Sequence, residues 1–298
     1  MGLGCGPIGR RPDNSVDEEV GLQTVLAALD SGVRLLDTAA LYLDGVSERL
    51  VGEALRQRPD LKGEIVVETK VRDRRDFGYS ADETRRSVET SLRRLGLDHL
   101  PVVYVHDPPA ALLDRVLAPD GAVAALRQLQ AEGVVGHVGI ASNNPWDNAP
   151  YVETGEFEVA VVPDAYSLLN QTALERIFPA AERFGMGVVV ATPVERGLLA
   201  TGVKAARWGE HANRRFSPES VAQVEKLEAI CDRHGVSLLA VALQYVTRHP
   251  VVSATIPGSR SPDEARANTA AMLEPIPDAL WTELEPELRT FETAVPPA

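Results

Sequence analysis

Short runs of β-branched and apolar residues recur along the chain at nearly regular intervals. Runs of this length, bounded by turn residues, are typical of strands buried on both faces of a sheet. The predicted strands are 2–6, 33–37, 64–70, 102–106, 137–142, 159–162, 187–192 and 251–257.

The segments between these runs place their apolar residues at helical spacing. Several begin at a residue suited to cap a helix. The clearest predicted helices are 17–30, 47–57, 80–95, 120–132, 174–184 and 217–234. Strict alternation of strands and helices favours a parallel sheet closed into a (β/α)8 TIM barrel, here a single domain spanning residues 1–298.

Two segments fall outside this alternation. Residues 197–218 form the longest connection without a predicted element, and long loops on such scaffolds usually act as functional lids. Residues 293–298 are expected to fray at the end of the chain.

The composition of the chain argues against nucleic acid, metal ions and membranes as partners. The 30 basic and 43 acidic residues give a net charge of −13, and no basic run favours nucleic acid. Cys5 and Cys231 lack the spacing of a metal site or disulfide framework, which favours the reducing cytoplasm and no bound metal. No apolar stretch approaches the roughly 20 residues that span a membrane.

Residues 4–9 read Gly-Cys-Gly-Pro-Ile-Gly and match a dinucleotide-binding fingerprint. That fingerprint requires a full strand before it and a helix opening within it, whereas Pro7 and Pro12 interrupt any helix at this position. We interpret this segment as a glycine-rich turn at the barrel mouth, where Cys5 and Gly6 approach a ligand closely.

Three predicted strands end on ionisable residues, namely Asp37, Lys70 and His106, and Tyr42 lies in the loop after Asp37. The carboxyl ends of parallel barrel strands meet at one face, so these side chains are expected to surround one cavity. A phenol has a pKa of about 10, and a nearby ammonium favours its ionised form. The pattern predicts proton transfer by Tyr42, tuned by Asp37 and Lys70, with neutral His106 polarising a substrate oxygen.

Motifs spread over nearly the whole chain resemble the aldo-keto reductase family, and within it the sugar 1-dehydrogenases for L-fucose, D-threo-aldose and L-galactose. The most specific piece is 37–42, Asp-Thr-Ala-Ala-Leu-Tyr. Further matching pieces are 45–48, 67–70, 87–96, 105–108, 139–143, 166–170, 197–199 and 256–260.

The resemblance implies that a nicotinamide cofactor lies extended across the barrel mouth without a Rossmann domain. It implies that Ser142 and Asn143 hold the carboxamide, that Gly197 and Leu198 lie along the pyrophosphate, and that 258–268 bind the adenosine half. The residues expected at the cofactor are therefore Cys5, Gly6, Ser142, Asn143, Tyr166, Thr192, Pro193, Gly197, Leu198, Gly258, Ser259, Arg260, Glu264 and Asn268.

The chain departs from the family pattern in four places. Pro163 replaces a frequent Gln, and Ala191 replaces a frequent aromatic under the nicotinamide, for which Tyr166 is either a substitute or a structural residue. The hairpin that usually precedes the first strand is missing or short. Glu264 stands where an Arg often binds the 2′-phosphate of NADP, which favours NAD, although Arg260 could clamp a phosphate.

These features lead to three hypotheses. The first is oxidation of an aldose at C1 to a lactone, with Tyr42 as the base and a preference for NAD. The second is a general aldehyde or ketone reductase that uses the same residues, and the third is a non-catalytic nucleotide-binding barrel. Asp107, Trp208 and Trp281 are candidates for the substrate wall, with the tryptophans equally consistent with packing roles. Monomer and dimer both fit the sequence.

Overall fold

The computed structural model describes residues 1–72, 74–203 and 216–291. Eight strands form one sheet in chain order, and every neighbouring pair is parallel. The strands are β1 (Leu3–Gly4), β2 (Leu35–Asp37), β3 (Val66–Val71), β4 (Leu100–His106), β5 (Val135–Ala141), β6 (Val159–Val162), β7 (Gly187–Ala191) and β8 (Val252–Ile256).

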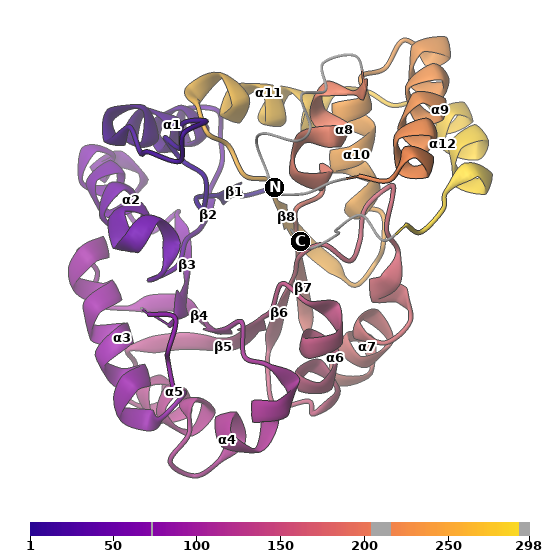
Figure 1. The fold of residues 1–298 in the computed structure, drawn as a ribbon. Coiled ribbons are helices and arrows are strands. Elements are labelled where there is room, and N and C mark those ends of the chain that lie inside the picture. The colour runs from indigo at the N-terminus through magenta and orange to yellow at the C-terminus, as the bar shows by residue number, and fades with distance from the viewer. Residues whose placement is uncertain (73, 204–215, 292–298) are drawn as a thin grey trace.

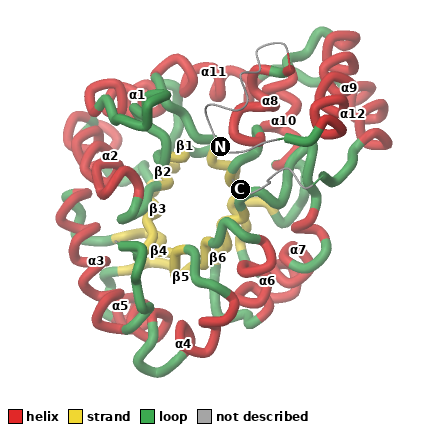
Figure 2. The backbone as a smooth tube through the Cα atoms, viewed as in Figure 1, coloured by secondary structure: helices red, strands yellow, loops and turns green. Residues whose placement is uncertain are grey.

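Hydrogen bonds between the first strand and the segment around the last one close the sheet. The Gly2 amide donates to Thr255 O at 2.8 Å, and the Gly4 amide donates to Pro257 O at 2.9 Å. Gly4 also forms a parallel bridge with Gly258. The strands therefore form a ring (Figure 2), which confirms the predicted (β/α)8 barrel.

Helices surround this ring on its outer side (Figure 1). They are α1 (Glu18–Asp30), α2 (Val46–Gln57), α3 (Ala81–Leu95), α4 (Leu113–Leu117), α5 (Ala122–Ala131), α6 (Pro145–Glu153), α7 (Ile177–Phe184), α8 (Leu198–Thr201), α9 (Pro218–His234), α10 (Leu238–Val246), α11 (Pro262–Leu273) and α12 (Asp278–Leu284). Asp17, Ser80 and Ser217 each accept a backbone N–H at a helix start, which explains why capping residues marked these boundaries.

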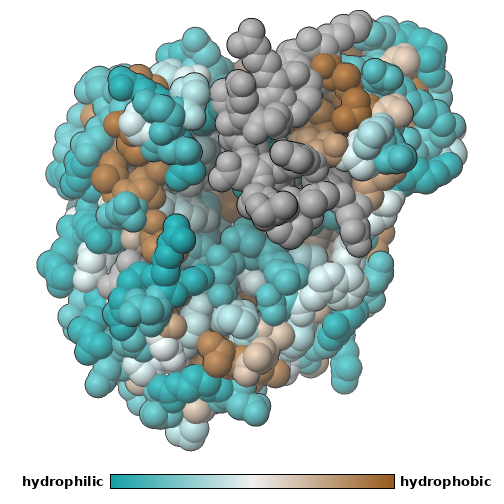
Figure 3. All heavy atoms as spheres, in the orientation of Figure 1, coloured by the Kyte–Doolittle hydropathy of each residue, from teal (hydrophilic) through white to brown (hydrophobic). Residues whose placement is uncertain are grey.

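The core has two parts. A large cluster lies between strands and helices, and a smaller one of Tyr104, Ala141, Val161, Val189 and Ile256 is separate from it. The outer helices present a mostly hydrophilic surface on the face shown in Figure 3, as expected for a chain with a charge of −13.

The predicted loop 197–218 begins with a short helix, α8. Its residues 204–215 lie outside the described residues, as does the tail 293–298. No strand precedes β1 in the described residues. Within the same ranges, no helix is long and apolar enough to cross a membrane, and no group of three or more potential ligands is placed to hold a metal ion.

Candidate active site

The structure brings Asp37, Tyr42, Lys70 and His106 together. The Lys70 ammonium forms a buried ion pair with the Asp37 carboxylate and donates to Thr38 O at 2.8 Å. Its Nζ lies 4.7 Å from the centre of the Tyr42 ring. The Tyr42 and His106 rings meet edge to face, with centres 5.6 Å apart. The strand ends therefore converge as the parallel topology predicts.

The loop after β2 is fixed at both ends, which sets the position of Tyr42. Ser47 bonds Thr38 through the two hydroxyls at 2.8 Å and donates to Cys5 O at 2.9 Å. From α3, the Arg94 guanidinium donates to Ala40 O at 3.1 Å. The loop is thus attached both to the turn after β1 and to the helix layer.

Tight backbone turns complete this support. Leu43 and Asp44 have φ values of 52° and 54°, a left-handed conformation that non-glycine residues adopt rarely. A Cβ at Gly6 would lie 3.5 Å from Cε2 of Tyr42, so the turn after β1 packs against the ring. Tyr42 therefore occupies one defined place above Lys70.

The ammonium of Lys70 beneath Tyr42 keeps its charge. Burial by itself would lower the pKa of Lys70, but the carboxylate of Asp37 and the phenol of Tyr42 together hold it above the usual range. Burial raises the pKa of the Asp37 carboxyl, and Lys70 opposes that rise. Lys70 consequently remains an ammonium that faces the phenol.

Burial is nevertheless the larger influence on Tyr42. It raises the pKa of the phenol to about 12, while Lys70 acts in the opposite direction without compensating fully. In this structure the burial of Tyr42 outweighs the influence of Lys70, whose direction is the one that the sequence predicts. In this structure Tyr42 holds its proton and is first of all a proton donor.

His106 is neutral. Burial and, to a lesser extent, the positive charges of Lys70 and Arg72 hold the pKa of His106 well below its usual range. Its buried Nδ1 has no hydrogen-bond partner, and its Nε2 lies 3.8 Å from Oδ2 of Asp107. A neutral imidazole offers one N–H, which suits it to hold a substrate oxygen.

Asp107, a candidate for the substrate wall, lies next to His106, and hydrogen bonds from Asn143 fix its carboxylate. Asn143 donates to it through its backbone N–H at 2.8 Å and through its side-chain amide at 2.9 and 3.1 Å. The Asn143 amide nitrogen is therefore engaged, which leaves its oxygen for a carboxamide. Ser142 lies beside it at the end of β5, 3% exposed.

The backbone at the end of β7 is strained where the cofactor is expected. Thr192 has a φ of +55°, and its hydroxyl accepts from the Asp164 amide at 2.7 Å. Pro193 comes next in the chain, and Gly197, with a φ of +111°, precedes α8. Leu198 is fully buried. A glycine in this conformation leaves room for close approach of a pyrophosphate, so this segment fits the expected group.

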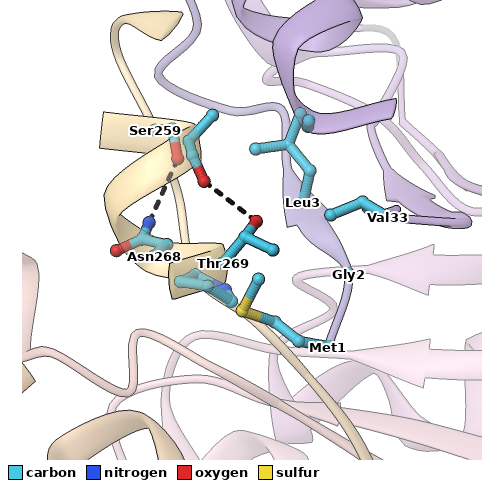
Figure 4. A pocket seen from close by; sticks show the side chains of 10 residues that line it. Met1, Gly2, Leu3, Val33, Ser259, Asn268 and Thr269 are labelled. Atoms are coloured by element: carbon cyan, nitrogen blue, oxygen red, sulfur yellow. Dashed lines mark hydrogen bonds between the residues drawn. The ribbon is translucent and has the colours of Figure 1, made fainter. Parts of the chain in front are cut away.

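The segment after β8, where the adenosine half is expected, joins the barrel seam through its backbone and buries two polar side chains. Gly258 lies beside Gly4 at the barrel seam, and Asn268 donates to the Ser259 hydroxyl at 3.1 Å (Figure 4). Both side chains also line a small pocket between β1, α1 and α11 that is too tight to admit a ligand as it stands (Figure 4). This cavity does not include the four proposed catalytic residues.

Arg260 and Glu264 contact one another. The guanidinium donates to Glu264 Oε1 at 3.1 and 3.3 Å, and the Arg260 amide donates to Oε2 at 2.7 Å. Both side chains are about two-fifths exposed, so a ligand can reach them. The Glu264 carboxylate therefore occupies the Arg260 guanidinium.

Two predicted residues make packing contacts, and one falls outside the described residues. Tyr166 stacks on Tyr245 and meets Phe178 edge to face, which favours its structural role over that of a substitute for the aromatic missing at Ala191. Trp281 is buried on α12 beneath Arg248, which favours the packing role that the sequence also allows. Trp208 lies in the part that the structure does not describe.

Sequence reasoning also missed residues near the site. Glu68 and Tyr104 are hydrogen-bonded to each other next to the Asp37–Lys70 pair, and Arg72 approaches Asp107 to 3.7 Å. Glu68 and Lys70 are two apart on one strand, so they share a side of the sheet. That alternation was the available signal, because a charged residue in a buried strand requires a partner.

Comparison with known proteins gives consistent matches. A profile described as the Aldo/keto reductase family matches residues 1–286. The chain is 31% identical to the pyridoxal 4-dehydrogenase of Microbacterium luteolum, over 96% of this chain and 93% of that protein. It is 30% identical to a D-threo-aldose 1-dehydrogenase of a Pseudomonas species, over 95% and 92%. The holo form of an aldo-keto reductase from Bacillus halodurans aligns with a TM-score of 0.77 and 28% identity, covering 98% and 93%.

Proposed function

Because this chain belongs to the aldo/keto reductase family, we propose that it oxidises an aldose at C1 to a lactone with a nicotinamide cofactor, preferably NAD. The observation that carries this proposal is the buried Asp37–Lys70 pair beneath the Tyr42 phenol, beside the neutral His106. Two relatives named as dehydrogenases, one of them for an aldose, support the oxidative direction.

Each residue of the site has its own task in this reaction. Tyr42, in its ionised form, accepts the proton of the C1 hydroxyl, and Lys70, whose Nζ lies 4.7 Å from the ring centre, stabilises the phenolate. His106 orients the C1 oxygen through its N–H, and Asp107 lies next to it to contact a further hydroxyl. When bound, the nicotinamide supplies the acceptor for the hydride from C1.

The pairing of Arg260 with Glu264 supports NAD. A 2′-phosphate would have to displace the carboxylate from the guanidinium or lie close to its negative charge, whereas a ribose diol can donate to that carboxylate. We expect a higher kcat/KM with NAD than with NADP. The opposite order would contradict this cofactor assignment.

A panel of reactions tests the substrate class. Free aldoses with NAD or NADP are compared with small aldehydes and NADH or NADPH, using the absorbance of the reduced nicotinamide. We expect lactone formation from at least one aldose and a preference for NAD. If no sugar is turned over while aldehydes are, the aldose proposal fails.

The second candidate function is reduction of small aldehydes or ketones. Its support is the pKa of Tyr42, about 12, because a phenol that keeps its proton is ready to protonate a carbonyl oxygen. The same panel separates the two candidates, since this one predicts the larger kcat/KM in the aldehyde reactions.

A further inference from the structure

A second carboxyl lies beside the catalytic ion pair. Glu68 is on β3, where it is the register partner of Asp37 on β2 and precedes Lys70 by two residues. It is 1% exposed. The Tyr104 hydroxyl donates to its Oε2, whereas its Oε1 has no hydrogen-bond partner. A buried carboxyl with a free oxygen is costly unless it carries a proton.

The charges around Glu68 do not balance. It faces the carboxyl of Asp37 on β2, the ammonium of Lys70 on β3 and the phenol of Tyr104 on β4. Lys70 forms its ion pair with Asp37, and no cation is paired with Glu68 in the described part of the chain. Since His106 is neutral, two buried carboxyls share one ammonium. One of the two is then favoured to be protonated at neutral pH.

We propose that Glu68 is a positioning residue for proton transfer: by holding or releasing one proton beside the Asp37–Lys70 pair, it sets how much positive charge faces Tyr42. When Glu68 is protonated, Asp37 is the carboxylate that faces the ammonium of Lys70. Without that proton, a second negative charge lies next to Lys70 and disfavours the Tyr42 phenolate. The proposal rests on the family reaction and not on the aldose as substrate.

The position of the titration supports this role. Burial and then Asp37 raise the pKa of Glu68 to about 7, against the opposing effects of the Tyr104 hydrogen bond and Lys70. Glu68 thus changes its charge in the neutral pH range, in which the enzyme is expected to work. A charge of this kind, two residues from Lys70 on the same strand, is expected to change the rate of the Tyr42 step by roughly tenfold.

Infrared titration combined with pH profiles tests the proposal. In the wild type, a protonated-carboxyl band should disappear around pH 7 and be absent from Glu68→Gln. The oxidation rate should show an inflection at the same pH, measured with whichever sugar or aldehyde-derived alcohol is turned over. In Glu68→Gln the inflection should vanish, because the amide stays neutral.

Tyr104→Phe is the matched second variant. Its missing hydroxyl removes a hydrogen bond that lowers the pKa of Glu68, so band and inflection should both move to higher pH. A purely structural pair would change thermal stability in both variants and leave the shape of the pH profile intact, which would overturn the proposal. A carboxyl band that titrates only at ordinary acid pH would overturn it even if no substrate were turned over.

Discussion

Tyr42 is subject to two opposing influences, and their balance determines its chemistry. Burial favours the neutral phenol, while the ammonium of Lys70, 4.7 Å from the ring centre, favours the phenolate. The motif predicted the second influence, because ionisable residues at strand ends are visible in a sequence. It could not predict the first, because burial depends on the turn at Gly6 that packs on the ring.

This balance predicts opposite pH dependences for the two directions. Oxidation needs the phenolate, and below a pKa of about 12 the ionised fraction of Tyr42 rises tenfold for each pH unit. Oxidation should therefore accelerate from pH 7 to 9 by about a hundredfold at most, less any opposing contribution from Glu68. Reduction needs the phenol and should not gain. Steady-state profiles in both directions check this, and oxidation that slows with rising pH would contradict it.

The first turn of α11 brings Arg260 and Glu264 into contact. Ser261 caps the helix by accepting the Glu264 N–H, and Glu264 reaches back to the amide and guanidinium of Arg260. From the sequence, both residues are expected at the adenosine half, where Glu264 favours NAD and Arg260 favours NADP. Their pairing depends on helix geometry, which brings side chains four residues apart into contact.

Glu264→Gln is expected to shift cofactor preference. The amide carries no charge to hold Arg260, so the guanidinium becomes available to a 2′-phosphate. Affinity for NADP should rise by roughly tenfold or more, as expected for a charge-assisted pair worth about 1.5–3 kcal/mol, with a much smaller change for NAD. Fluorescence titration of both reduced cofactors measures this. Unchanged NADP affinity would show that this pair does not select the cofactor.

Helix and strand positions were predictable because their signals are local. Strand β6 was predicted with the boundaries it has, and Asp17, Ser80 and Ser217 marked helix starts. The contact between Asn143 and Asp107 was not, because it joins the loops after two strands. It also depends on a left-handed backbone at Asp107, with a φ of +45°, and the residue type alone does not predict that conformation.

At the scale of the whole molecule, the alternation of strands and helices predicted the closed barrel, and the comparisons confirm the family that the motifs resemble. Closure itself depends on close backbone approach at the seam between β1 and β8. A Cβ at Gly4 would lie 2.8 Å from the carbonyl oxygen of Ile256, too close to be accepted without movement.

Gly4→Ala should therefore destabilise the barrel. Overpacking of this kind costs about 1–3 kcal/mol, which should lower the Tm by several degrees in thermal unfolding. Gly187→Ala, on β7, is the matched control, because its nearest neighbour would be Ser253 Oγ at 3.4 Å and little should change. Equal Tm values for the two variants would contradict the importance of the seam.

The most direct test of the proposed mechanism is hydride transfer by Tyr42→Phe, measured as reduced-nicotinamide absorbance with the best substrate of the panel. Loss of the phenolic proton should reduce kcat by about 10²–10⁴-fold, while cofactor binding and Tm stay close to the wild type. Tyr166→Phe, in the aromatic cluster of Tyr245 and Phe178, should retain activity within about twofold, since packing changes away from the chemistry leave the barrier intact. Full activity in Tyr42→Phe would contradict the central role of this phenol.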